Sequence, residues 1–234
     1  MSSEHIYKQY DAELESVRAK VLEMGSLVEQ QIVDALESLV KSNAQLAENV
    51  IKKDHLVNDL EVQVDEDCSH IIARRQPAAS DLRMILMMIK TITDLERIGD
   101  EATKIARFSQ KTQETDRMWA PRFTEIRTMA NMAREMLHIA LDAFARSDSA
   151  KVLKIAEMDQ QLDEHYQMSI RHLITFMLED PRTISISLEV LFIAKAIERI
   201  GDHAKNISEY VVYMVKGKDV RHISMDAMAD EVRD

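Results

Sequence analysis

Glycine and proline are scarce in this chain: 4 glycines and 3 prolines occur among 234 residues, where ordinary proteins carry roughly 7% and 5%. Because these two residues make most tight turns, a chain with so few of them has few turns. The single cysteine, Cys68, excludes an internal disulfide and fits a reducing compartment. These shortages, with 46% apolar and 30% charged residues, predict long helices around a sizeable core.

Long apolar runs and an excess of positive charge are also missing. The longest uninterrupted apolar stretches, residues 84–89 and 210–215, are much shorter than the ~20 residues that span a bilayer. The polar N-terminal stretch lacks the apolar segment of a signal peptide. We therefore expect a cytoplasmic protein that reaches a membrane only by docking on a partner. The net charge of −11 cannot neutralise phosphate backbones, so nucleic acid is not an expected partner.

Apolar residues recur at helical spacing along nearly the whole chain. Breaks fall at Ser42 and Asn43, where Ser42 with Gln45 matches a capping box, and at Pro77 and Pro181, because a proline pushes the preceding residue out of the helical conformation. The pattern predicts six long helices: one that ends near residue 41, then 44–75, 80–109, 121–145, 147–178 and 183–216.

The six predicted helices fall into two groups of three. The polar stretch KTQETDRMWAPRF, which contains Pro121, is the expected joint between the halves. Long helices joined by short loops pack as antiparallel bundles. We therefore predict an all-α fold of two tandem three-helix bundles, residues 1–113 and 114–216. A polar C-terminal tail, residues 217–234, is expected to be frayed or to form a short helix.

The pentapeptide ERIGD occurs twice, at residues 96–100 and 198–202, and holds two of the four glycines. A repeat of this kind indicates an internal duplication. Its two acids stand four residues apart, which makes them neighbours on one helix face, where like charges repel by a few tenths of a kcal/mol. The glycine between them costs about 1 kcal/mol relative to alanine. This cost suggests either the close approach of another backbone or room for a ligand.

The second helix of each half supplies a matching pair of polar side chains four residues apart. Facing antiparallel helices would bring these pairs opposite the pentapeptide acids and create a four-cornered site of oxygen atoms. Such a site suits hard or borderline cations, among them Mg²⁺, Mn²⁺ and Fe, with Ca²⁺ or Zn²⁺ as further options. The candidate metal ligands are Glu96, Asp100, Asp54 and Asn58 in the first half and Glu198, Asp202, Asp159 and Asp163 in the second.

A ladder of ion pairs along each helix is the alternative explanation of the repeat. In that arrangement Arg97 and Lys104 would neutralise the first pair of acids, and Arg199 and Lys205 would neutralise the second. Exposed helices often carry such ladders. The duplication, the apolar setting and the interior glycines favour the cation site.

Two segments of the sequence, ARRQPAASDLRMILMMIKTITDLERIGDEATKIAR and AIERIGDHAKNISEYVVY, closely resemble the signature regions of the PhoU family. The resemblance extends over almost the whole chain. It implies two similar three-helix bundles with metal clusters on the acidic motifs, variously of iron, zinc, magnesium, manganese or nickel. The family motif corresponds to Glu96, Asp100, Glu198 and Asp202. Asn58 stands where the family pattern has an acid, which weakens the expected site of the first half.

The resemblance also implies a role. Members of this family are cytoplasmic, often homodimeric, and repress the phosphate-starvation response when phosphate is plentiful. They link the ATPase subunit of the phosphate ABC transporter to a sensor histidine kinase, and they restrain phosphate uptake. The expected function is therefore that of a metal-binding adaptor and negative regulator.

An enzyme of the ferritin-like type, with carboxylate-bridged metals, is the alternative from another functional class, and a metal-free helical scaffold is a third possibility. Ferritin-like sites need a Glu-x-x-His element on each of two helices. Gly99 and Gly201 occupy the positions where those histidines would stand. The chain also lacks a P-loop and other glycine-rich phosphate cradles. The sequence therefore predicts a protein that is not an enzyme.

Overall fold

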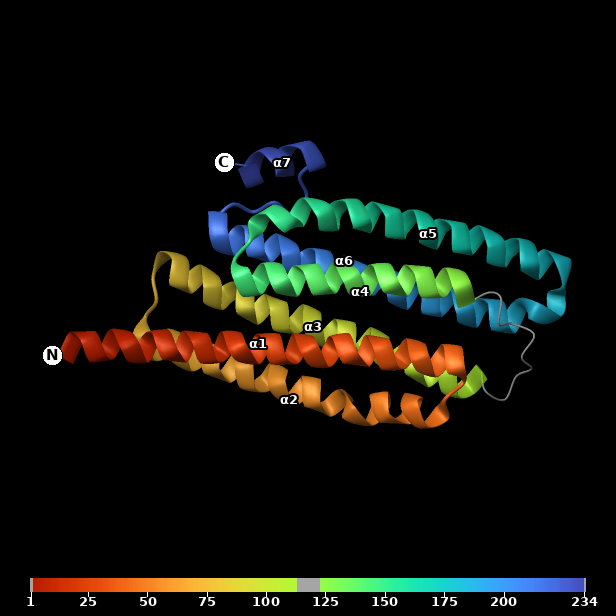
Figure 1. Cartoon of the computed structure of the whole chain (residues 1–234), viewed down its shortest axis with the longest axis horizontal. Helices are drawn as coiled ribbons and strands as arrows, with labels where there is room; N and C mark the ends of the chain where they lie inside the picture. Colours follow the sequence, from red (N-terminus) through yellow and green to blue (C-terminus); the bar gives the residue numbers. More distant parts are fainter. Residues whose placement is uncertain (1, 113–122, 234) are drawn as a thin grey trace.

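The computed structural model describes residues 2–112 and 123–233, and these residues form helices without any strand (Figure 1). The predicted all-α class is confirmed, and the six predicted long helices appear within a few residues of their expected bounds. The predicted joint around Pro121 lies outside the described residues. The helices are α1 (Ser2–Lys41), α2 (Ala44–Arg75), α3 (Ala79–Thr112), α4 (Phe123–Arg146), α5 (Val152–Glu179), α6 (Ile184–Lys216) and a short α7 (Met225–Arg233).

The predicted capping box at the start of α2 is wrong by one residue. Ser42 ends the preceding helix with a positive φ of 52°. Asn43 is the residue that caps α2, and its side-chain oxygen accepts a hydrogen bond from the backbone N–H of Leu46 at 3.1 Å. The short asparagine side chain reaches the third N–H of the helix directly, which satisfies one of the unpaired donors there.

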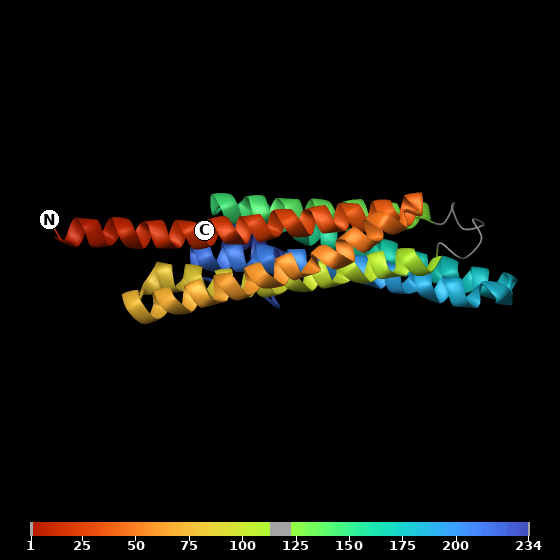
Figure 2. The ribbon, with the colours of Figure 1, turned by 90° about the horizontal axis from the view of Figure 1, so that it is seen from below.

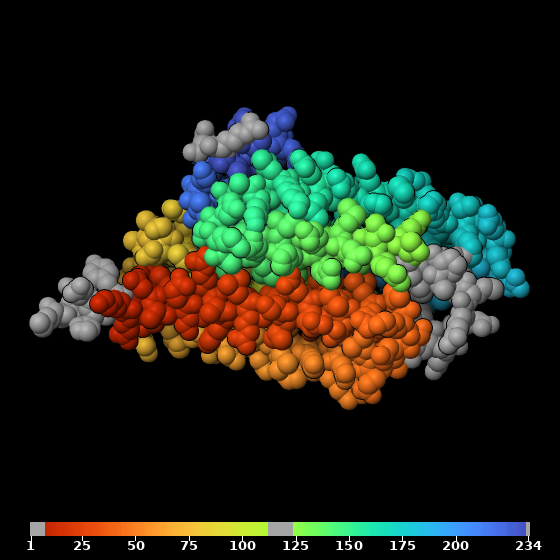
Figure 3. Space-filling view, viewed as in Figure 1, coloured from red at the N-terminus to blue at the C-terminus, as the bar shows by residue number. Residues whose placement is uncertain are grey.

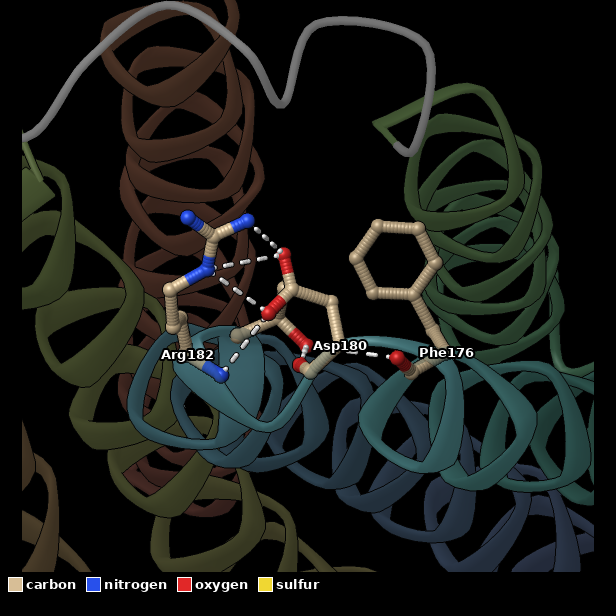
Figure 4. Close-up of polar contacts among 4 residues, drawn as sticks. Phe176, Asp180 and Arg182 are labelled. Carbon is tan, nitrogen blue, oxygen red and sulfur yellow. Dashed lines mark hydrogen bonds and ion pairs between the residues drawn. The ribbon is translucent and has the colours of Figure 1, made fainter.

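The predicted break at Asp180 and Pro181 is confirmed, and Figure 4 shows how it is held. The Asp180 N–H donates to the carbonyl of Phe176 at 3.1 Å. The Asp180 carboxylate accepts from the backbone N–H of Arg182 at 3.0 Å and from its guanidinium at 2.9 Å. These bonds hold the pKa of Asp180 below its ordinary value. A single 3₁₀ turn, η3 (Pro181–Thr183), then leads into α6.

The six long helices form a central group of four with one helix on each flank. α1, α3, α4 and α6 pack on one another in the centre, α2 lies outside α1 and α3, and α5 lies outside α4 and α6 (Figure 1). In the perpendicular view, α1 and α4 lie on one side and α3 and α6 on the other (Figure 2). One continuous apolar core draws side chains from all six helices. The two halves of the chain therefore share an interior.

A hydrogen bond and an ion pair cross the contact between α3 and α6. The Nδ1 of His203 donates to Oδ1 of Asp94 at 2.6 Å, and the two side chains are only 10% and 4% exposed. Burial and the charge of Asp94, to which its hydroxyl bonds, raise the pKa of Tyr210. A second pair joins Arg199 to the buried carboxylate of Glu101 at 2.7 Å. We call this contact the α3–α6 seam.

The helices α1 and α4 form the second contact between the halves, and they lie along each other across the face drawn in Figure 3. The guanidinium of Arg18 lies 5.9 Å from the centre of the Phe144 ring. It also donates to the carbonyls of Phe144 at 3.0 Å and Ala145 at 2.6 Å. Arg18 thus satisfies carbonyl groups that the end of α4 leaves without partners.

The C-terminal segment is packed, and of the two predicted alternatives the short helix is the one that forms. Gly217 ends α6 with a φ of 71°, and its N–H donates to the carbonyl of Tyr213 at 2.9 Å. The segment then covers α5 and α6 in a small apolar cluster of Val152, Ala156, Val212, Val220, Met228 and Val232. Within the described part of the chain, no helix combines the length and apolar character needed to cross a bilayer.

The seam gives the first testable prediction. Replacing Asp94 by Ala is expected to lower the free energy of unfolding by about 3 kcal/mol, because it leaves His203 and Asn206 without their buried acceptor. The control is Glu37→Ala, which breaks an exposed pair with Lys41 and should cost at most about 0.5 kcal/mol. Urea denaturation measures both values, and equal losses would show that the seam contributes no more than a surface ion pair.

Candidate functional site

Each ERIGD pentapeptide lies in the middle of a central helix, with its isoleucine turned into the core. Ile98 on α3 and Ile200 on α6 are 0% and 1% exposed. Glu96 and Glu198 are half-buried, while Asp100 and Asp202 are exposed. These acids lie close to the flanking helices, because carboxylates of α2 raise the pKa of Glu96 and carboxylates of α5 raise the pKa of Asp202.

The first acidic cluster consists of Asp54 and Glu61 on α2 with Glu96 and Asp100 on α3. Burial, followed by the charges of Asp100, Glu61 and Asp54, raises the pKa of Glu96 against the opposing charge of Arg97. Burial and the charge of Asp65 raise the pKa of Glu61. The cluster therefore holds two carboxylates, Glu61 and Glu96, whose ionised forms are disfavoured by their surroundings.

The predicted candidates of the first half are only partly brought together. Asp54 lies in the cluster and accepts hydrogen bonds from Thr103 Oγ1 at 3.0 Å and Gln31 Nε2 at 3.4 Å. Asn58 is exposed, and among the described residues nothing hydrogen-bonds to it. The charge of Glu61, a residue not predicted from the sequence, raises the pKa of Glu96 instead. Its position seven residues after Asp54 puts it on the same face of α2 and was the signal that could have revealed it.

The second acidic cluster contains all four predicted candidates: Asp159 and Asp163 on α5 with Glu198 and Asp202 on α6. Although Asp202 is exposed as a residue, desolvation of its carboxyl, with the charges of Glu198, Asp159 and Asp163, raises its pKa to about 6, and Lys195 opposes the change. Burial, with the charges of Asp159 and Glu198, also raises the pKa of Asp163. The facing-helix geometry expected from the sequence is therefore present in this half.

Two lysines enter the second cluster. The Nζ of Lys205 donates to Oδ2 of Asp159 at 2.6 Å, from α6 to α5. Lys195 pairs with Glu198, and its Nζ lies 5.5 Å from the centre of the Tyr166 ring. The alternative explanation, a ladder of ion pairs along α6, does not hold for these residues, because Lys205 reaches across to α5 and Arg199 turns into the α3–α6 seam.

The first half does not form the alternative ladder either. Lys104 pairs with the buried carboxylate of Glu101 at 3.0 Å. Among the described residues, no lysine or arginine forms an ion pair with Glu96 or Asp100. The negative charges of Glu96 and Asp100 can therefore be compensated by the surrounding water or by a bound cation.

The two glycines allow close approach of side chains, whereas the sequence suggested another backbone or a ligand. A Cβ at Gly201 would lie 2.4 Å from Cδ2 of Leu162 and 3.5 Å from Cε of Met136. A Cβ at Gly99 would lie 3.0 Å from Oε1 of Gln31, 3.6 Å from Cγ1 of Val57 and 3.8 Å from Oδ1 of Asp54. The glycine of the second half thus faces side chains without oxygen, and that of the first half faces two oxygen atoms beside one apolar atom.

The donors suit a cation, although they are not gathered around one point. In the described ranges, no three His, Cys, Asp or Glu side chains converge closely enough to hold a metal ion. The donors are carboxylate oxygens, the kind that hard cations prefer. Oε1 of Gln31, beside the first acidic cluster, is buried and has no hydrogen-bond partner. Metal binding at the eight candidate residues stays a prediction.

The contacts of the glycines give the second testable prediction. Gly201→Ala is expected to lower the free energy of unfolding by about 1–2 kcal/mol, because overpacking against Leu162 outweighs the gain in helix propensity of about 1 kcal/mol. Gly99→Ala is the matched control, since the tip of Gln31 can move aside and the change should stay below about 1 kcal/mol. Chemical denaturation compares them, and a stabilised Gly201→Ala variant would contradict the packing described.

The raised pKa of Asp202 gives the third testable prediction. The folded chain binds a proton at this carboxyl up to about pH 6, against an ordinary value of 3.8. Ionisation therefore destabilises the fold as the pH rises through this window, and the cost persists at pH 7. In a chelating buffer Asp202→Asn should stabilise by about 1 kcal/mol at pH 7, a figure reduced because solvent screens this exposed residue.

This gain should fade as the pH falls from 6 toward the ordinary pKa of 3.8 and vanish below about pH 3, where the carboxyl is protonated in both states. Asp180→Asn is the control of opposite sign, because Arg182 lowers the pKa of Asp180. That variant should lose stability at pH 7, and the loss should fade as the pH falls. A gain for Asp202→Asn that is equal at pH 4 and pH 7 would refute the electrostatic account.

Comparison with known proteins places these features in a family. A phosphate-specific transport system accessory protein PhoU homolog from Pseudomonas putida is 48% identical over 230 residues, which are 98% of this chain and 89% of that protein. The phosphate-specific transport system accessory protein PhoU of Escherichia coli K12 is 45% identical over 231 residues, covering 97% of this chain and 93% of that one.

Solved structures agree with the sequence relatives. The crystal structure of PhoU from Pseudomonas aeruginosa matches with a TM-score of 0.86 at 44% identity, over 89% of this chain and 100% of that chain. The phosphate transport system regulatory protein PhoU from Streptococcus pneumoniae matches with a TM-score of 0.83 at 29% identity, over 90% and 99%. The PhoU domain itself matches twice, at residues 21–109 and 126–211, once in each half. The chain therefore belongs to the PhoU domain family.

Proposed function

We propose that this chain is a non-enzymatic accessory protein of a phosphate transport system, which represses the phosphate-starvation response when phosphate is plentiful and restrains phosphate uptake. One observation carries the proposal: the chain aligns over 97% of its length with a relative named as an accessory protein of phosphate-specific transport. The match to a solved structure named as a phosphate transport system regulatory protein agrees with it.

The proposed mode of action is that of an adaptor. The chain, acting in the cytoplasm and as a homodimer, would contact both the ATPase subunit of the phosphate ABC transporter and the sensor histidine kinase of the phosphate response. The described part of the chain contains no helix that could span a bilayer. Contact with the membrane would therefore come through these partners.

A surface suited to docking lies on α6. Ile184, Leu188 and Phe192 recur every four residues, and their exposed fractions are 43%, 42% and 68%. Residues at this spacing share one face of a helix, and apolar groups that face solvent together often mark contact sites with other proteins. We name these three residues the α6 stripe. It supports the adaptor proposal because an adaptor needs accessible apolar contacts.

The two acidic clusters would add bound cations to this scaffold, with iron, zinc, magnesium or manganese as candidates. A bound cation would supply positive charge between α2 and α3 or between α5 and α6. The carboxylates of the clusters would then be neutralised in place, and each flanking helix would be tied more firmly to its central helix. Gly99 and Gly201 take the places where a ferritin-like site needs histidine. This observation disfavours the enzyme alternative.

A genetic complementation experiment tests the proposal and gives the fourth prediction. Deleting the gene should release an alkaline phosphatase reporter of phosphate starvation from repression in high phosphate, and the wild-type chain should restore repression. If the reporter stays repressed after deletion, the proposed function is wrong.

Two substitutions locate the docking surface. Phe192→Glu should fail to restore repression, because it places a charge in the α6 stripe. Val62→Glu, at a residue of α2 that is 57% exposed, is the matched control and should restore repression fully. Circular dichroism verifies that both variants are folded. Equal repression by the two variants would remove the α6 stripe from the contact.

A further inference from the structure

We propose that the two acidic clusters are not equivalent: the first binds a divalent cation directly, whereas two of the four carboxylates of the second are already paired with lysines of the chain, so that it binds a cation only weakly. This inference rests on the cation binding included in the proposed function. It reverses the expectation from the sequence, in which Asn58 made the first half the weaker site.

The residues that flank the two pentapeptides differ in a regular way. Three residues before the glutamate stands Thr93 in the first half and Lys195 in the second. Three residues after the aspartate stands Thr103 in the first half and Lys205 in the second. One half thus has neutral hydroxyls at both positions, and the other has ammonium groups.

In the second half, both ammonium groups form ion pairs with carboxylates of the cluster. Lys205 Nζ lies 2.6 Å from Oδ2 of Asp159, whose side chain is 9% exposed. Lys195 pairs with Glu198 and is fixed over the ring of Tyr166. Charge-assisted hydrogen bonds of this kind are the strong ones. A metal ion that enters this cluster must first displace a lysine from an oxygen that the metal needs.

In the first half, the corresponding threonines leave the charge of the carboxylates in place. Thr103 donates a neutral hydrogen bond to Asp54 at 3.0 Å. The hydroxyl of Thr93 bonds back to the carbonyl of Ile89 in its own helix at 3.2 Å. Within the described residues, no ion pair involves Asp54, Glu61, Glu96 or Asp100. These four carboxylates therefore keep the charge that attracts a cation.

Gln31 is an independent sign of a ligand at the first cluster. This side chain of α1 is 94% buried, since only 6% is exposed, and its Nε2 donates to Asp54 at 3.4 Å. Its Oε1 has no partner and lies beside Gly99, where a Cβ would be 3.0 Å away. Buried polar atoms normally have a partner. A cation, or a water molecule bound to one, would supply the missing partner.

The same place in the second half is closed by apolar atoms. Leu162 and Met136 fill the space beside Gly201, and they offer no oxygen. The donors of the first cluster are carboxylate and amide oxygens, which favour Mn²⁺, Mg²⁺ or Ca²⁺ over softer metals. We therefore expect the first cluster to bind Mn²⁺ more tightly than the second.

Calorimetric titration of metal-free, full-length protein with Mn²⁺ tests the inference and is the fifth prediction. Glu96→Gln/Asp100→Asn should weaken the tighter binding at least tenfold. Glu198→Gln/Asp202→Asn removes the same charge from the second half and should change it less than twofold. If the second pair of substitutions abolishes the tight binding and the first pair spares it, the inference is wrong.

Exchanging the flanking residues tests the proposed cause. Thr103→Lys should lower the affinity of the first cluster about tenfold, and Lys205→Thr should create measurable binding at the second. Lys154→Thr removes a lysine that pairs with Glu135 outside both clusters and should leave both affinities unchanged, which controls for net charge. Thermal unfolding confirms that each variant is folded. Unchanged Mn²⁺ binding in Thr103→Lys and Lys205→Thr would overturn the inference.

The outcome is separable from that of the proposed function. A wild-type chain that restores repression but binds no Mn²⁺, or binds it only through the second cluster, would overturn this inference and leave the regulatory role intact. A chain that binds Mn²⁺ through the first cluster but fails to restore repression would support the inference and overturn the regulatory role.

Discussion

The packing of α3 against α6 is the contact on which the other features of the molecule depend. Each of these helices contacts both its own half and the other, so each must bury more than one face. Ile98 and Ile200 point into the common core, and Glu101 and His203 enter the α3–α6 seam. The remaining side of each of these two helices faces its flanking helix, α2 or α5. The carboxylates of the pentapeptides lie there because the helical period leaves them no other place.

The sequence contains enough information for the helices and for the duplication. The helix boundaries at Asn43 and Asp180 follow from side chains that bond to nearby backbone groups, and the one at Gly217 follows from the left-handed conformation that glycine adopts readily. Such local signals can be read from the chain. The pairing of helices cannot be read in the same way. An apolar stripe shows which face is buried without showing what covers it, so the contacts of α1 with α4 and of α3 with α6 needed coordinates.

The candidate site shows the same division. The acids of ERIGD and the pair Asp159 and Asp163 were predictable, because spacing along one helix fixes which residues share a face. Glu61 was missed although its spacing from Asp54 could have revealed it. The cross-helix partner of Lys205 was not predictable, because it depends on the axial offset between neighbouring helices. Gln31 comes from a third helix, and nothing in its local sequence relates it to Asp54. Polar contacts between residues far apart in the sequence could not be predicted from the sequence.

Both clusters retain an unfavourable feature that an ordinary core would remove. Crowded carboxylates and a buried amide oxygen without a partner lower stability, and the large shared core offsets that loss. Proteins usually tolerate such features where a ligand is to be bound. The second half has relieved part of the repulsion with Lys195 and Lys205. Duplicated sites can therefore diverge in charge while the backbone that carries them stays alike.

The residue that follows each pentapeptide has a consequence for assembly. Glu101 in one half and His203 in the other stand at matching positions, and both enter the seam. In a symmetric pair of identical bundles, these two positions would hold the same side chain. A glutamate would then stand on both sides of the seam. Joining the two bundles in one chain permits a different residue on each side. The molecule behaves as a covalent heterodimer, with a fixed internal partner and two inequivalent outer surfaces.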